Sequence, residues 1–133
     1  MRKRPSFETL DVYRLSEELS DAAWRIVSSW GTFDRDVVGK QLVRAADSIG
    51  ANIAEGTGRW HFQDNRRFVR IARGSLYEVQ HWLRRAYRRQ LLSETDVNSL
   101  RAILDELNPR LNAYLKSIGR KNTSQDQTPD PQT

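Results

Sequence analysis

Apolar residues recur at intervals of three and four in four successive segments of this chain, and that spacing sets what it can fold into. Such spacing places the apolar side chains on one face of an α-helix, whereas a half-buried strand needs alternation with a period of two. No comparable alternation is present, so the sequence predicts an all-α protein. The most regular of the four stripes consists of Val97, Leu100, Leu104, Leu107, Leu111, Tyr114 and Ile118.

The four segments predict helices over residues 11–30, 35–55, 63–90 and 94–118. Four amphipathic helices with short connections pack most simply as an antiparallel, up-down, left-handed four-helix bundle. A chain of 133 residues can enclose one core, so residues 1–118 are expected to form a single domain. Residues 119–133 are polar and contain proline, which predicts a disordered C-terminal tail.

Glycine and acidic residues suggest where the first two helices begin and end. Gly31 is expected to cap the first helix, and Asp34 or Asp36 to cap the start of the second. Gly56 is expected to stop the second helix and Gly58 to form the turn that follows, both with the positive φ that glycine tolerates.

The last two helices carry their own signals. Ser93 is expected to cap the fourth helix, while Pro109 predicts a bend in one continuous helix, with Asn108 near the kink. The third helix has an unusually wide apolar stripe, which could face both its own core and a neighbouring subunit. Its expected inward residues are Phe68, Ile71, Ala72, Ser75, Val79, Trp82, Leu83 and Ala86, with Leu76 and Tyr87 widening the stripe.

Several classes of function find no support in the sequence. The chain lacks cysteine, and His61 and His81 stand twenty residues apart without a metal-binding motif, so we predict no metal site and no cofactor. No catalytic triad order or phosphate-binding glycine loop is present, so we predict that the protein is not an enzyme. Neither a signal peptide nor a membrane span is evident, which predicts a cytoplasmic protein.

Polar residues accompany the apolar stripe of the second helix. Ser48, Asn52 and Glu55 share one face, and they are expected to form a structural hydrogen-bond network, with Arg59 and Arg73 as partners. A role in ligand binding is the alternative. Gly74 on the third helix is expected to let the backbone of another helix come near.

Positive charge is concentrated in the third helix. Eighteen of the twenty-two basic residues are arginine, and the segment from 59 to 89 contains nine arginines against two acidic residues. Arginines interleaved with aromatic rings suit contact with phosphates and stacking on bases. The alternative is that they pair with acids of neighbouring helices, such as Asp47, Asp105 and Glu106. The nine are Arg59, Arg66, Arg67, Arg70, Arg73, Arg84, Arg85, Arg88 and Arg89.

Three motifs follow one another along the chain. The central motif is Gln41, Arg44, Ala45, Ala46, Ser48, Ile49, then residues 52–56, Gly58 and Arg59. The flanking motifs are Phe7, Leu10, Val12 and Tyr13 before it, and Phe68, Ile71, Ala72, Gly74, Ser75, Leu76 and Glu78 after it. Together they resemble a known family, the bacterial four-helix-bundle proteins called 23S rRNA intervening-sequence proteins, and the resemblance covers roughly residues 7–118.

This resemblance implies an up-down four-helix protomer that assembles into a ring-like homopentamer. Members are often encoded within insertions in large-subunit ribosomal RNA genes. A related bundle is an accessory protein of reverse transcriptases in diversity-generating retroelements, where it binds nucleic acid and the polymerase. Two departures are His61, where the family usually has a capping serine, and a higher arginine content.

Two functions therefore compete. The first is an oligomeric module that binds RNA through the arginines of the third helix. The second is a protein scaffold or accessory subunit that docks an acidic partner on the same arginine face.

Overall fold

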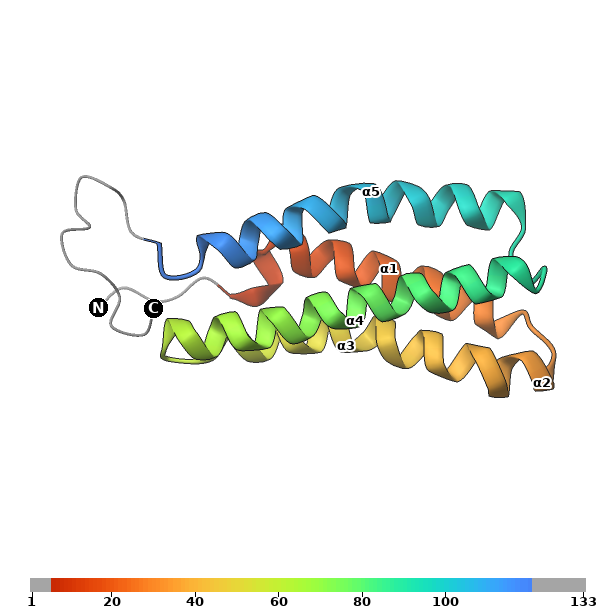
Figure 1. Cartoon of the computed structure of the whole chain (residues 1–133), viewed down its shortest axis with the longest axis horizontal. Helices are drawn as coiled ribbons and strands as arrows, with labels where there is room; N and C mark the ends of the chain where they lie inside the picture. Colours follow the sequence, from red (N-terminus) through yellow and green to blue (C-terminus); the bar gives the residue numbers. More distant parts are fainter. Residues whose placement is uncertain (1–5, 121–133) are drawn as a thin grey trace.

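The computed structural model describes residues 6–120, and every regular element in that range is a helix, which confirms the predicted all-α class. The four long helices alternate in direction along the chain, as the predicted up-down arrangement requires (Figure 1). Each packs on the next, and α5 returns against α1. The handedness of the bundle stays a prediction. The elements are η1 (Phe7–Thr9), α1 (Asp11–Ser28), α2 (Thr32–Asp34), the π-helical η2 (Arg35–Gly39), α3 (Lys40–Thr57), α4 (Phe62–Arg88) and α5 (Glu94–Ser117).

The apolar stripes predicted for the first, second and fourth segments form the core. Leu19 of α1, Ile49 of α3 and Leu107 of α5 have no exposed surface. Burying a side chain of this size contributes roughly 1.5–3 kcal/mol, so these stripes supply most of the drive for folding. At the end of the bundle where α1 ends and α5 begins, the Trp30 Nε1–H donates to the Leu91 carbonyl oxygen over 3.0 Å. This bond links the end of α1 to the α4–α5 connection.

The buried face of α4 differs from the predicted one. Ile71 and Tyr87 were expected inside or at its edge, yet they are 46% and 60% exposed. Because apolar residues cover a wide part of the surface of this helix, the sequence alone does not show which row of side chains faces the core. The buried line is Val69, Ala72, Leu76, Val79, Leu83 and Ala86, which keeps the 3-4 spacing throughout.

The second helical segment begins earlier than predicted. α1 ends at Ser28, and Gly31 is the N-cap of α2 and not the C-cap of α1. Asp34 and Asp36 lie within the first turns and make no capping hydrogen bond. Gly39 closes the π-helical turn, buried against α1, where an added Cβ would lie 2.5 Å from Val27 Cγ1.

Gly56 has a different role from the predicted helix stop. α3 continues through Thr57, and its C-cap Gly58 has a φ of −77°, so the predicted positive φ is wrong for this turn. A Cβ added to Gly56 would lie 2.5 Å from Asn65 Oδ1 and 3.1 Å from the Asn65 carbonyl oxygen. Gly56 is therefore needed because α3 and α4 approach closely there.

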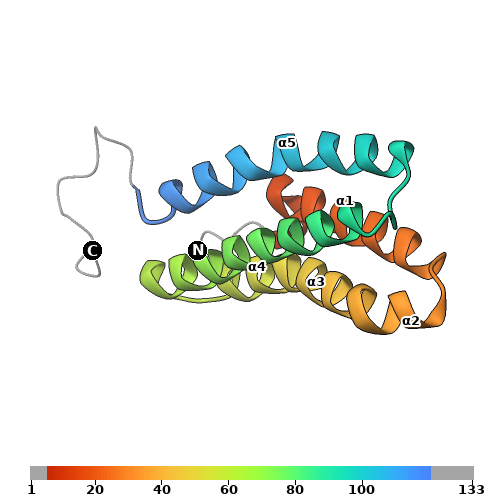
Figure 2. The same ribbon diagram turned by 45° about the vertical axis from the view of Figure 1, so that its right-hand side comes forward.

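α5 follows its predicted outline. Ser93 Oγ accepts from the Asp96 N–H, and the Asp96 carboxylate accepts from the Ser93 N–H, each over 3.0 Å, which confirms the capping site. The helix continues past Pro109, and its axis bends partway along in both views (Figures 1 and 2). Of the predicted tail, Gly119 and Arg120 are described below, whereas residues 121–133 lie outside the described range.

In the part of the chain that the structure describes, none of the helices combines the length and the apolar character that crossing a membrane requires.

Two glycines allow a matched test of the α3–α4 packing. We expect Gly56→Ala to lower the free energy of unfolding by about 1–3 kcal/mol, because its methyl group meets the backbone and side chain of Asn65. Gly74 is exposed and nothing in the protomer lies within 4 Å of an added Cβ, so the predicted close approach is absent there. Gly74→Ala should raise stability by about 0.5–1 kcal/mol.

Urea unfolding followed by circular dichroism measures both variants. Equal changes for the two glycines would contradict the close packing assigned to Gly56.

Candidate functional site

The predicted polar network lies between α3 and α4. Ser75 Oγ donates to Ser48 Oγ over 2.9 Å, and Asn52 Nδ2 donates to the Ser48 carbonyl oxygen and to Ser48 Oγ over 2.8 and 3.0 Å. Glu55 stands apart from this chain of bonds and pairs with Arg59 over 2.9 Å on the surface. Because these groups bond to one another within the protomer, they stabilise the packing of α3 against α4 and leave few donors or acceptors for a ligand.

A second polar seam joins α4 to α5. Arg66 Nη1 donates to the Ile118 carbonyl oxygen over 2.8 Å, and Arg73 Nη1 donates to Asn112 Oδ1 over 3.3 Å. Arg73 was expected to partner the network of α3, and this contact with α5 replaces that expectation. Both acceptors are uncharged, so these bonds hold the guanidinium groups in place without cancelling their charge.

A hollow of about 470 Å³ opens between the first half of α4 and the end of α5. We call it the basic hollow, because its lining within residues 6–120 includes five cations and no acidic side chain. The sequence prediction included three of the five and missed Lys116 and Arg120. The antiparallel order was the available signal, since it places the start of α4 beside the end of α5. The five are Arg66, Arg70, Arg73, Lys116 and Arg120.

A glycine turn positions the last of these cations. Ile118 has φ −68° and ψ 125°, Gly119 has φ 80°, and the Arg120 N–H donates to the Ser117 carbonyl oxygen over 3.1 Å. These values match a type II turn, whose third residue needs positive φ. The turn brings Arg120 to the basic hollow.

A second group of arginines occupies the other end of α4. Arg84, Arg88 and Arg89 are exposed and Arg85 is half-buried. Between residues of the described range, none of these four forms an ion pair with an acid. Glu106, one of the acids expected to neutralise the third helix, pairs instead with Arg110 of its own helix.

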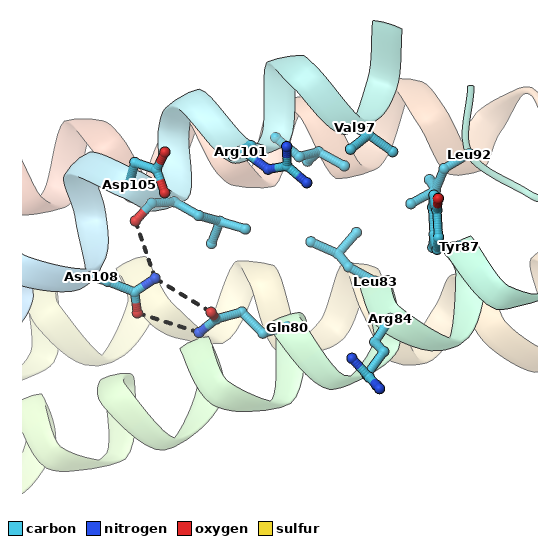
Figure 3. Close-up of a pocket in the computed structure, with 11 residues that line it drawn as sticks. Gln80, Leu83, Arg84, Tyr87, Leu92, Val97, Arg101, Asp105 and Asn108 are labelled. Carbon is cyan, nitrogen blue, oxygen red and sulfur yellow. Dashed lines mark hydrogen bonds between the residues drawn. The ribbon is translucent and has the colours of Figure 1, made fainter. Parts of the chain in front are cut away.

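Beside this second group, a groove of about 410 Å³ separates α4 from α5 (Figure 3). At one end of the groove Gln80 and Asn108 exchange two hydrogen bonds of 3.3 and 3.4 Å. Its walls are mainly apolar, with charged residues at the rim. The apolar lining comprises Leu83, Leu92, Val97, Leu100 and Leu104, and the charged residues are Arg84, Arg101 and Asp105.

Metal-ligating side chains do not gather anywhere in residues 6–120: no three His, Asp or Glu side chains there could hold an ion together. His61, the N-cap of α4, makes no capping hydrogen bond with its side chain, in line with the departure from the usual serine.

One protein-family model, described as 23S rRNA-intervening sequence protein, matches residues 8–113. The chain belongs to this family. The resemblance inferred from the three sequence motifs is thereby confirmed, and the match includes all of α4 and most of α5. No curated protein matches the chain. In this member of the 23S rRNA-intervening sequence proteins, the basic hollow extends beyond the matched range to Arg120.

Gly119 provides a test of the turn that closes the basic hollow. Because its φ is 80°, Gly119→Ala should lower the free energy of unfolding by about 1 kcal/mol. Gly119→Asn should lower the free energy of unfolding by less, since asparagine tolerates this conformation. Thermal unfolding of the full chain measures both. Equal stability of the wild type and Gly119→Ala would contradict the assigned turn.

Proposed function

We propose that this protein is a non-enzymatic RNA-binding protein that contacts RNA through the arginine-rich surface of α4. The observation that carries the proposal is the basic hollow, in which cations of α4, of α5 and of the turn after α5 converge and no acid of residues 6–120 is present. Guanidinium and ammonium groups suit phosphate oxygens in both charge and hydrogen-bond geometry. The exposed members Arg70, Lys116 and Arg120 are the most accessible to a phosphate backbone.

Most of the predicted arginines form no ion pair with an acid of residues 6–120, whereas Arg59 pairs with Glu55. Those without such an ion pair are Arg67, Arg70, Arg73, Arg84, Arg85, Arg88 and Arg89. The net charge of the chain is +5, yet the segment from 59 to 89 carries +7, so the rest is slightly acidic. Such a concentration of charge on one helix favours a polyanion and orients it toward α4.

We further propose that the protein acts as a homo-oligomer, a pentamer by family resemblance. Ile71 and Tyr77 are about half exposed on α4, and Gly74 between them leaves open space. Several copies in a ring would multiply a modest basic surface through avidity. Light scattering at micromolar concentration measures the mass, and a species with the mass of a single chain would contradict this part of the proposal.

A second candidate function is an accessory subunit that docks an acidic protein. The groove between α4 and α5 supports it, because apolar walls with Arg84 and Arg101 at the rim suit an acidic amphipathic helix. Two results would favour this candidate over RNA binding: a partner that stays bound after nuclease treatment, and loss of that partner in Leu104→Lys.

RNA binding makes a quantitative prediction. The affinity of the full-length protein for a labelled single-stranded RNA should fall as salt rises, with log affinity decreasing by about 0.7 per log unit of salt for each phosphate neutralised. The charge reversal Arg88→Glu should weaken binding and reduce this slope. Arg25→Glu is the matched control, because it changes the net charge equally at an exposed site on α1.

Fluorescence anisotropy measures these affinities. Absence of binding at low salt, or an affinity that does not depend on salt, would contradict the proposed function. An equal loss in Arg25→Glu and Arg88→Glu would mean that the arginines at the end of α4 are not part of the binding surface.

A further inference from the structure

A second hollow lies at the end of the bundle where α4 begins and α5 ends. It has a volume of about 240 Å³, and residues at the ends of α3, α4 and α5 contribute to it, together with Leu10 at the start of α1. We call it the apolar hollow, because four of the eight described residues that line it have large apolar or aromatic side chains. These four are Leu10, Phe62, Tyr114 and Ile118.

The apolar hollow adjoins the basic hollow. Both are lined by Ile118 and Gly119, so the turn that ends α5 forms the shared wall. Phe62 and Arg66 are four residues apart on α4 and therefore lie one above the other on the same face. An aromatic ring on one side of the turn is thus paired with a cluster of cations on the other.

We propose that these two hollows together bind one nucleotide of a single-stranded RNA. The base enters the apolar hollow against Phe62 and Tyr114, and the phosphate lies in the basic hollow near Arg70, Lys116 and Arg120. This inference rests on the proposed function and deepens it by naming the form of RNA and the place where it binds.

The shape of the site favours a single strand over a duplex. In a duplex the bases are stacked and paired inside the helix, so their faces cannot reach a hollow lined by rings. A duplex can touch only the cations, through its phosphates. Single-stranded RNA can use both hollows, because an unstacked base is free to turn into the protein.

The test compares a labelled single-stranded RNA with the duplex of the same sequence, both titrated with full-length protein at low salt. Wild type should bind the single strand more tightly than the duplex. Phe62→Leu removes the ring but keeps an apolar side chain, and it should weaken single-strand binding about 5- to 100-fold without changing duplex binding. Phe62→Tyr keeps the ring and should bind the single strand as wild type does.

Two cation variants separate the basic hollow from the rest of α4. Lys116→Ala should weaken single-strand binding and reduce the salt slope by about 0.7, in keeping with one lost phosphate contact. Arg88→Ala, at the opposite end of α4, should weaken single-strand and duplex binding by the same factor. Circular dichroism checks that each variant keeps the helical content of wild type.

The results distinguish this inference from the proposed function. If wild type binds both RNAs equally, or if Phe62→Leu binds the single strand as tightly as wild type, the nucleotide site is wrong and RNA binding by α4 stands. If wild type binds neither RNA at low salt, both proposals are wrong. Loss of single-strand preference in Phe62→Leu, with its retention in Phe62→Tyr and Arg88→Ala, supports the site.

Discussion

The close approach of α3 and α4 fixes the orientation of every residue on α4, and the rest of the structure depends on it. Gly56 gives the two backbones room beside Asn65, and the Ser48–Ser75 hydrogen bond holds the same pair of helices further along. Small side chains on the buried faces, such as Ala46 and Ala72, allow this spacing. With one face of α4 committed to α3 and the core, the arginines have to lie on the remaining surface.

The hydrogen-bond acceptors between α4 and α5 decide how much positive charge the surface of α4 keeps. Arg66 donates to a backbone carbonyl, and Arg73 donates to an asparagine amide where a carboxylate would have neutralised it. The amide holds the Arg73 side chain without cancelling its charge. The same contacts that hold α5 in place therefore preserve an electropositive end of the bundle.

The helical spacing predicted the four long helices, the Ser93 cap and the continuity of α5 through Pro109, because these features depend on neighbours within a few residues. The role of Gly56 was not predictable, since glycine serves equally as a helix stop or as a site of close packing, and only the position of Asn65 decides between them. Lys116 was missed for a related reason. It is far from the other cations in sequence, and only the pairing of α4 with α5 brings it among them.

The hydrogen-bonded seam between α4 and α5 also bears on the internal dynamics of the bundle. Polar bridges can exchange with water at little net cost, whereas the apolar contacts of α5 with α1 cannot. Tilting of α5 about α1 thus exposes less hydrophobic surface than separation of α3 from α4 does. Native-state hydrogen exchange should accordingly find the amides of α5 opening at lower free energy than those of the α3–α4 hairpin, as a distinct cooperative unit.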